Sequence, residues 1–281
     1  MPANPLRPTA IAAAAVVALV VAGTVGARGA ATSVQLRVTL SAAQEAPAPT
    51  GDVSNARGTF AGRLVRSGTG ASLEWTLTSS GLTGPAVAAH IHTGAPGQPG
   101  PVVVPLCGPC SSPAGGTATV DAALLSAIQG GQAYVNVHTP ANRAGEIRAQ
   151  LASVASTTAK LNARQEVPRP RGRANRARGT FSLTATKNGA DATIAWRLTF
   201  SRLTGRALAA HIHVGARGRA GGVAVPLCGP CRSAVRGTAR VSGATLAALE
   251  SGRAYVNVHT RQNPGGEIRG QLAALPLTIT P

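Results

Sequence analysis

Residues 134–139 read Tyr-Val-Asn-Val-His-Thr, and residues 255–260 read the same six amino acids in the same order. Within the first copy, Tyr134, Asn136 and His138 alternate with two valines. Successive side chains of an extended strand point to opposite faces. The period of two therefore predicts a β-strand with valine on one face and polar groups on the other. The same strand occurs twice, at an offset of 121 residues.

The offset of 121 residues holds throughout the body of the chain, and no insertion or deletion separates the markers. It relates matched residues of several types: Glu45/Glu166, Trp75/Trp196, His90/His211, Cys107/Cys228 and Glu146/Glu267. A period this long indicates two whole domains rather than the short units of a solenoid. We expect the first domain at residues 32–153, the second at 154–276, and a C-terminal tail at 277–281.

The composition favours β structure in both domains. Hydrophobic residues make up 44% of the 281 residues and charged residues only 13%, while 34 glycines and 20 prolines supply turns. This composition excludes a coiled coil and a collagen. About eight short alternating runs per domain predict a sandwich or a barrel. One helical pattern covers 121–130, with Asp121 as N-cap and Gly130 as the stop, and it recurs at 242–252. Residues 139–145 are expected to form the loop of an antiparallel hairpin.

The first 31 residues have the features of an export signal. Arg7 gives a positive end, an apolar run covers 10–22, and small residues follow. This order is typical of a secretory signal peptide, with cleavage expected after Ala27 or Ala31. The alternative is an uncleaved anchor, although the run is shorter than the ~20 residues of a spanning helix. We therefore expect a secreted or extracytoplasmic protein of the cell envelope, with membrane contact only through an uncleaved signal.

Each half contains five motifs in one order: Ala-His-Ile-His, Gly-x-x-Gly, Val-Pro-Leu-Cys, Tyr-Val-Asn-Val-His-Thr and Gly-Glu-Ile-Arg. In this order they resemble the CHRD domain, which is named after chordin and is found widely in secreted bacterial proteins. The resemblance covers nearly all of both halves. It implies an immunoglobulin-like β-sandwich, through a limited similarity of the family to copper/zinc superoxide dismutase. It implies no settled activity for bacterial members.

The fold class that we predict is therefore all-β. It consists of two consecutive immunoglobulin-like or superoxide-dismutase-like β-sandwich domains, each with one short helix, after the N-terminal signal segment.

All six histidines fall at matched positions: His90, His92, His138, His211, His213 and His259. Side chains at i and i+2 of a strand share a face, so two histidines of each half lie side by side. If the strand of the third histidine is a neighbour, three imidazoles with an open fourth position suit Zn or Cu. Further polar residues are candidates to support the site: Glu45, Asn136, Glu146, Glu166, Asn257 and Glu267. A dismutase site needs more ligands and a bridging histidine, which the sequence lacks.

A structural role is the alternative interpretation of the histidines. In that case they are satisfied polar residues that donate hydrogen bonds to Glu45, Glu146 or backbone carbonyls.

Cys-Gly-Pro-Cys occurs at 107–110 and 228–231 and has the spacing of the thioredoxin active site. In thioredoxin the motif opens a helix, whereas here a Pro precedes it and Gly- and Ser-rich loops follow. Two close pairs in an exported protein predict two local disulfides, each of small stabilising effect because the closed loop is short. The expected pairs are Cys107–Cys110 and Cys228–Cys231. Metal ligation and thiol redox work are the alternatives.

Positive charge is concentrated in the second half. Residues 32–153 carry six basic residues against five acidic ones, whereas 154–281 carry 19 against four, in a chain of net charge +18. Five arginines form a dense cluster in an expected loop: Arg169, Arg171, Arg173, Arg176 and Arg178. We expect contact with anionic cell-envelope polymers, the alternative being a solvated basic loop. Specific nucleic-acid recognition is not expected, because a helical reading motif is missing and stacking aromatics are scarce.

Familiar catalytic signatures are missing from the sequence. It contains no nucleophile elbow, phosphate loop, dinucleotide fingerprint or His-Glu-x-x-His motif. We therefore interpret the chain as a secreted binding or structural module without defined catalytic activity. One alternative is a metal-binding protein, for Zn or Cu, with one three-histidine site per domain. The second alternative is a thiol–disulfide redox protein that acts through its Cys-Gly-Pro-Cys pairs.

Overall fold

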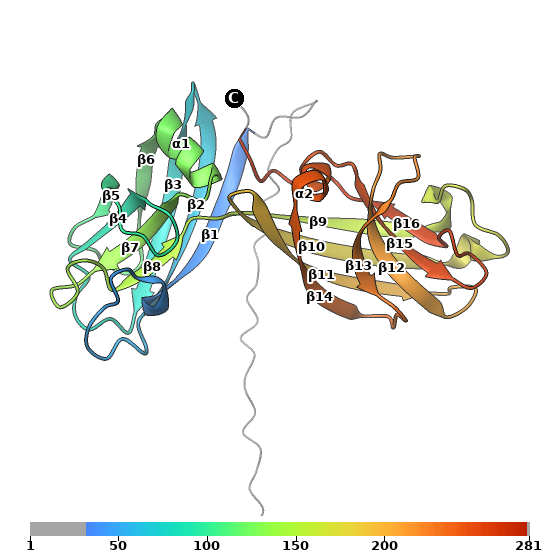
Figure 1. Cartoon of the computed structure of the whole chain (residues 1–281), viewed down its shortest axis with the longest axis horizontal. Helices are drawn as coiled ribbons and strands as arrows, with labels where there is room; N and C mark the ends of the chain where they lie inside the picture. Colours follow the sequence, from blue (N-terminus) through green and yellow to red (C-terminus); the bar gives the residue numbers. More distant parts are fainter. Residues whose placement is uncertain (1–31, 280–281) are drawn as a thin grey trace, which may run out of the picture.

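The computed structural model describes residues 32–279, which form two domains rich in β structure (Figure 1). The expected signal segment, residues 1–31, lies outside the described residues. Within the described part, no helix combines the length and the apolar character needed to cross a bilayer. The predicted all-β class, with two consecutive sandwich domains and one short helix in each, is confirmed.

Each domain contains eight strands and one short α-helix. The first domain comprises β1 (Ser33–Ser41), β2 (Arg57–Ser67), β3 (Gly70–Ser80), β4 (Ala88–Thr93), β5 (Val102–Cys107), β6 (Ala114–Val120), α1 (Ala122–Gln129), β7 (Ala133–His138) and β8 (Ile147–Gln150). The second comprises β9 (Ser153–Asn162), β10 (Arg178–Asn188), β11 (Asp191–Ser201), β12 (Ala207–Val214), β13 (Val223–Cys228), β14 (Val235–Ser242), α2 (Gly243–Glu250), β15 (Ala254–Thr260) and β16 (Ile268–Gln271). Short 3-10 turns occur at η1 (Ala42–Gln44), η2 (Ala163–Gln165) and η3 (Ala174–Arg176).

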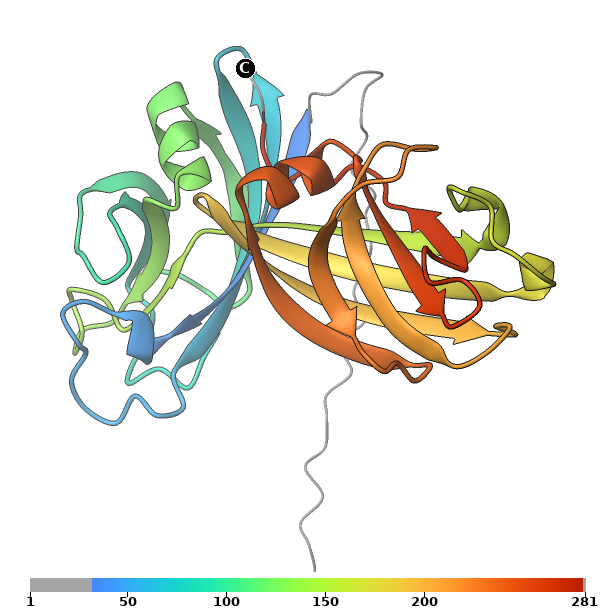
Figure 2. The same cartoon turned by 45° about the vertical axis from the view of Figure 1, so that its right-hand side comes forward.

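The strands of each domain form two antiparallel sheets. In the first domain a long sheet has the order β6-β3-β2-β1, and a short sheet has the order β5-β4-β7-β8. The two sheets meet at one corner, where Ser41 of β1 pairs with Arg148 of β8. The second domain repeats this arrangement, with a long sheet β14-β11-β10-β9 and a short sheet β13-β12-β15-β16 (Figure 2).

The core of each domain lies between its two sheets. Leu36 and Phe60 from the long sheet and Ile91 and Val135 from the short sheet are at most 1% exposed and belong to one hydrophobic cluster. These residues occupy alternate strand positions, so the period of two in the sequence translates directly into one buried face per sheet. The second domain has an equivalent cluster of its own.

The predicted helix is present in both domains. In the first, the Asp121 carboxylate accepts a hydrogen bond from the backbone N–H of Leu124 at 2.8 Å, and Gly130 ends the helix. This side-chain acceptor satisfies one of the free N–H groups of the first turn. In the second domain Ser242 takes the N-cap position without a side-chain hydrogen bond.

The two domains are joined edge to edge. Residues Gln35 and Leu36 of β1 pair antiparallel with Val154 and Ser153 of β9, which links all sixteen strands in one hydrogen-bonded network. The C-terminal segment adds a second link, because Ile279 is 3% exposed and belongs to the hydrophobic cluster of the first domain. The first domain therefore completes its core with a side chain that follows the second domain in the sequence.

Replacing Ile279 tests this second link. We expect Ile279→Ala to lower the free energy of unfolding of the first domain by about 2–4 kcal/mol, because the change leaves a cavity in a buried cluster. Chemical denaturation, followed by intrinsic fluorescence, measures the loss. Leu208→Ala is the control, because Leu208 is 50% exposed and its removal leaves the core intact. Equal stability of the two variants would contradict the placement of Ile279.

Candidate metal centre

The histidines lie on the face of the short sheet that points away from the hydrophobic core. On β4, Ala89 and Ile91 are fully buried in the core cluster. His90 and His92 alternate with them and therefore occupy the opposite face. On β7, Val135 and Val137 belong to the core in the same way. The pattern of Tyr-Val-Asn-Val-His thus produces a second, polar layer behind the sheet.

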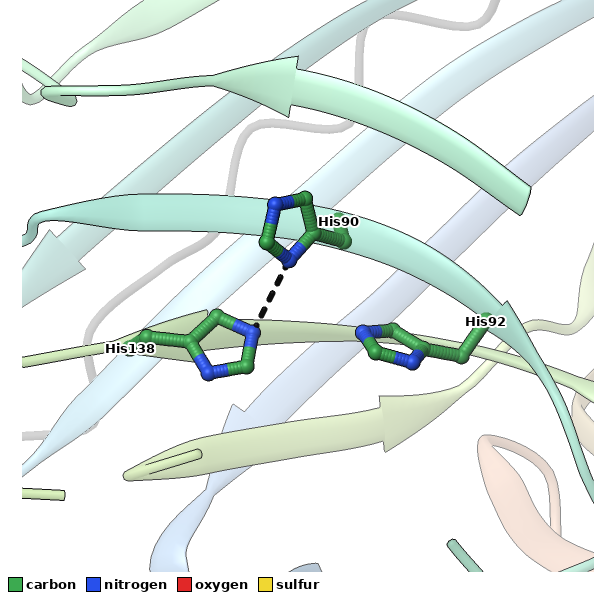
Figure 3. A group of neighbouring side chains, drawn as sticks. All are labelled: His90, His92 and His138. Atoms are coloured by element: carbon green, nitrogen blue, oxygen red, sulfur yellow. Dashed lines mark hydrogen bonds between the residues drawn. The ribbon is translucent and has the colours of Figure 1, made fainter. Parts of the chain in front are cut away.

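Strand pairing brings the third histidine to the other two. In the antiparallel pair of β4 and β7, Ala88 lies opposite His138, His90 opposite Asn136 and His92 opposite Tyr134. His138 is therefore a diagonal neighbour of His90, within reach of its ring. One ring nitrogen from each of the three histidines lies within 4.8 Å of the others. Figure 3 shows the three rings turned towards one space.

Backbone carbonyls fix the tautomers of two of these rings. Nδ1 of His92 lies 2.9 Å from the carbonyl oxygen of Gly100, and Nδ1 of His138 lies 2.9 Å from that of Arg143. Because a carbonyl oxygen can only accept, both Nδ1 atoms carry the hydrogen in the neutral rings. Both Nε2 atoms then hold a lone pair.

Those lone pairs are directed at the interior of the cluster. Nε2 of His138 lies 3.0 Å from Nδ1 of His90, which donates to it in the described arrangement (Figure 3). Nε2 of His92 is buried and has no hydrogen-bond partner. A buried polar atom without a partner is costly, and it therefore requires an explanation.

The side chains of Tyr134 and Arg148 form a stack against the His92 ring. The ring of Tyr134 stacks on that of His92, with centroids 4.8 Å apart and an interplanar angle of 9°. The guanidinium carbon of Arg148, on β8, lies 3.4 Å from the centroid of the Tyr134 ring. Arg148 also donates from Nη2 to the carbonyl of Ala95 at 2.9 Å, and this ties down the loop that covers the site. The stack holds one imidazole in a fixed orientation.

The cluster favours neutral imidazoles. Burial lowers the pKa of His90, and repulsion by His138 and His92 lowers it further. Burial is also the main cause that lowers the pKa values of His92 and His138. Their carbonyl hydrogen bonds oppose this effect in both rings, and the Asn136 side chain also opposes it in His92. Neutral rings hold lone pairs at neutral pH and need no proton release to bind a cation.

Asn136 and Glu45 form a second buried polar pair next to the histidines. Both Oδ1 of Asn136 and Oε1 of Glu45 are buried without a partner. Burial raises the pKa of Glu45 to about 7, although Arg148 and Asn136 oppose this shift. Gly145, at φ +133°, covers the pair so closely that a Cβ there would come within 2.5 Å of Glu45 Oε1. Only glycine fits this position without displacing the carboxylate.

Glu146 has a different role from the one considered in the sequence. Its carboxylate accepts hydrogen bonds from the N–H of Thr83 at 2.7 Å, from the Thr139 hydroxyl at 2.6 Å and from Asn142 Nδ2 at 3.0 Å, and also from the Thr83 hydroxyl. Burial raises the pKa of Glu146, but these donors outweigh it and hold the pKa below its ordinary value. Glu146 therefore fastens the 139–145 hairpin loop to the loop before β4, and no histidine is among these partners.

The second domain builds the same arrangement. Nδ1 of His211 lies 3.1 Å from Nε2 of His259, and Nδ1 of His213 lies 3.0 Å from the carbonyl of Gly221. His259 donates from Nδ1 to the carbonyl of Pro264 at 2.9 Å. The polar atoms without a partner recur at the matched positions: His213 Nε2, Asn257 Oδ1 and Glu166 Oε1. Glu267 binds Thr204, Thr260 and Asn263, as Glu146 does in the first domain.

The tyrosine–arginine support was not anticipated from the sequence. It recurs in the second domain, where Arg269 lies 3.4 Å from the Tyr255 centroid and Tyr255 stacks on His213. The alternation of side chains along the strand could have identified Arg148 and Arg269. Each follows an isoleucine that faces the core, so each must point to the opposite face, where the histidines lie. The carbonyl partners belong to loops, whose course no periodicity predicts.

The Cys-Gly-Pro-Cys pairs form disulfides in both domains. Cys107 is bonded to Cys110, and Cys228 to Cys231. Each pair follows an edge strand of the short sheet, and Cys110 N–H donates to the carbonyl of Ala86 at 2.9 Å. No helix begins at either motif, so the setting differs from the thioredoxin active site. The Cys107–Cys110 disulfide closes the turn at the end of the edge strand, and the hydrogen bond of the Cys110 N–H joins this turn to the segment that precedes β4 and its histidines.

The arginine cluster extends from the segment after η2 to the first residue of β10. All five side chains, Arg169, Arg171, Arg173, Arg176 and Arg178, are exposed. The loop is attached to the β15–β16 hairpin, because Arg171 N–H donates to Asn263 Oδ1 at 2.6 Å.

Comparison with known proteins identifies one family. The family model of the CHRD domain matches twice, at residues 36–151 and 157–272. Searches of the curated proteins and of the solved structures gave no match.

The buried carboxyls predict a pH effect on stability. In the metal-free chain, a carboxyl with a folded-state pKa of about 7 binds a proton more tightly when folded than when unfolded. Its stabilising contribution is complete below the unfolded pKa of about 4.5 and is lost as the pH rises through 7. We therefore expect Glu45→Gln/Glu166→Gln to gain stability relative to the unmodified chain between pH 5 and pH 8.

Urea denaturation at the two pH values measures this difference. The histidines are present in both proteins, so their contribution cancels in the comparison. Parallel stability curves for the variant and the unmodified chain would contradict the raised pKa of these carboxyls.

Proposed function

The chain belongs to the CHRD domain family, of which it carries two consecutive domains, and from this premise we propose that it is an exported binding module. Each domain is proposed to hold one transition-metal ion, Zn or Cu, at its three histidines. The tandem CHRD architecture supports a binding or structural role in general. The histidine geometry supports the more specific proposal.

The observation that carries this proposal is that Nε2 of His92 and Nε2 of His138 each hold a lone pair. Metal-binding histidines usually donate their other ring N–H to a carbonyl or carboxylate, which fixes the tautomer and raises ligand basicity. Both rings have this arrangement, with Gly100 and Arg143 as the acceptors. The buried Nε2 of His92 lacks a partner that a metal ion would supply. The second domain repeats every element of this geometry.

His90 completes the proposed ligand set. Its Nδ1 lies 3.0 Å from His138 Nε2, whereas ligand nitrogens around a tetrahedral ion with bonds of about 2.0–2.1 Å are about 3.4 Å apart. A shift of the His90 proton from Nδ1 to Nε2 frees the Nδ1 lone pair, and a small ring rotation opens the required space. The set then offers two Nε2 atoms and one Nδ1 atom.

The donor set selects the metal by its chemistry. Three neutral imidazoles suit Zn²⁺ and copper, whereas Mg²⁺ and Ca²⁺ prefer oxygen ligands. A bound ion would retain an open fourth position, for water or for a ligand. We propose binding rather than catalysis, because the carboxylate oxygens of Glu146 are engaged in hydrogen bonds from Thr83, Thr139 and Asn142 that fasten loops.

A structural polar cluster is the second candidate. The hydrogen bond between His90 and His138 supports it, because it satisfies two of the three rings without an ion. This candidate leaves the Nε2 atom of His92 without a hydrogen-bond partner, with the Asn136 side chain as its polar neighbour.

Export is part of the proposal for two reasons. The first 31 residues have the charge and apolar pattern of a signal peptide. The two disulfides are of the kind that persists in oxidising compartments outside the cytosol.

Metal content tests the proposed function. We expect the purified, tag-free chain to bind about two Zn or Cu ions after loading and dialysis, as measured by elemental analysis, one for each histidine group. His92→Ala should retain about one ion, and His92→Ala/His213→Ala none, because each change removes a ligand from one site.

Glu74→Gln is the control, since it removes an exposed carboxylate from the first domain while both histidine groups stay intact. Thermal unfolding checks that each variant is folded. A folded chain that takes up neither metal would refute metal binding and leave the structural cluster.

A further inference from the structure

The two domains share a scaffold but differ strongly on one surface, the outward face of the long sheet. In the second domain this surface carries five exposed basic side chains, which we call the cationic face: Lys160, Arg178, Arg197, Arg236 and Arg240. At the matched positions the first domain has Thr39, Arg57, Thr76, Gly115 and Thr119. Four of the five charges therefore belong to the second domain alone.

Two of these charges lie directly opposite each other. Arg197 of β11 pairs in register with Arg236 of β14, where the first domain pairs Thr76 with Gly115. Like charges at directly opposite positions repel and destabilise a sheet. The fold itself does not require this pair, because the first domain forms the same strands without it.

One acidic side chain, Asp191 at the start of β11, lies on the same outward face, next to the Thr193–Arg240 pair in the strand register. In the first domain, Arg63 and Glu74 form an ion pair of 3.9 Å on the equivalent surface. Thr184 and Ala195 replace that pair in the second domain. Within residues 32–279, none of the five basic side chains of the cationic face forms an ion pair. The charge is therefore available to an external anion.

The same face contains a groove of about 440 Å³ at one end of the sheet. The basic side chains of Lys160 and Arg178 lie on it, together with polar side chains of neighbouring strands: Asn162, Thr180, Thr199 and Ser201. In the strand register Thr180 lies between Lys160 and Thr199, so charge and hydroxyl groups occur side by side across three strands.

The arginine cluster extends this surface beyond the end of the sheet. Arg178 belongs to both, as the first residue of β10 and as a lining residue of the groove. The loop before it lies at the end of the second domain that is remote from the first (Figures 1 and 2). Hydrogen bonds of 2.6 and 3.3 Å between Asn263 and Arg171 hold the loop on the neighbouring hairpin.

We propose that the second domain binds an acidic polysaccharide along the cationic face and the adjoining arginine loop. The exposed guanidinium and ammonium groups would pair with carboxylate, sulfate or phosphate groups of the polymer. The asparagine, threonine and serine side chains of the groove would exchange hydrogen bonds with sugar hydroxyls. An extended polymer also fits a surface in which charges continue across several strands into a loop. This inference does not depend on metal binding.

The side chains of this surface favour a polysaccharide over other polyanions. Single-stranded nucleic acid is usually held by exposed aromatic side chains that stack on bases. In the second domain Trp196, Phe181 and Tyr255 are buried. The half-buried Phe200 lines the groove but also packs against the core, so the surface offers one aromatic residue and no series of stacking rings. Anionic lipid surfaces are commonly bound with inserted apolar groups. The exposed apolar residues of this domain, Leu208 and Val223, belong to the other sheet.

Binding to alginate, a polyuronate, tests the inference on the full chain. We expect binding that weakens as salt is added, and an affinity at least about tenfold lower for Arg197→Thr/Arg236→Gly, because each lost cation removes a contact with the polyanion. Both substitutions install the residue of the first domain, which preserves the strands. Calorimetric titration measures the affinity.

The control variant Arg219→Gln/Arg253→Gln removes two exposed charges elsewhere in the second domain and also installs the residues of the first. Its affinity should stay within about twofold of that of the unmodified chain. An equal loss in both variants would overturn the cationic face as a site, since net charge alone would explain it. Absent binding to alginate, or tighter binding to single-stranded DNA or phosphatidylglycerol vesicles, would overturn the choice of polysaccharide. Neutral dextran should not bind.

Discussion

Strand β7 is buried on both faces, and this double burial shapes the rest of each domain. Its valines complete the core, so its tyrosine, asparagine and histidine must form a second layer behind the short sheet. Buried polar groups need partners. The covering loops supply them: the Gly100 N–H donates to the Tyr134 hydroxyl, the Arg143 carbonyl accepts from His138, and Glu146 fastens the loops in turn. A polar site on a rigid sheet is the result.

Much of this could be predicted from the sequence, because it depends on local periodicity. The alternating strands, the helix capped by Asp121, the disulfides and the grouping of the histidines all follow from spacing. The hydrogen-bond partners of Glu146 could not be predicted, since the alternation of side chains along a strand does not show which loop its carboxylate contacts. The pairing of β1 with β9 and the burial of Ile279 depend on the relative placement of the domains, which internal periodicity does not encode.

The comparison of the two domains distinguishes the positions where both have the same residue from the positions where the residue has changed. The three histidines, the asparagine beside them, and the tyrosine and arginine that hold one imidazole are the same in both halves. The outward face of the long sheet, which contacts solvent, differs in four of the five positions that carry charge. The two domains thus keep the same histidine residues, while only the second has acquired a positively charged outer sheet face.

The burial of Ile279 in the first domain has a consequence for the order of assembly. Synthesis proceeds from the N-terminus, so the strands of the first domain emerge long before this isoleucine does. That domain receives the last piece of its interior only when the whole chain is available. The C-terminal segment therefore joins the core of the first domain only after the strands of both domains have been synthesised, and a chain truncated before Ile279 lacks this contact.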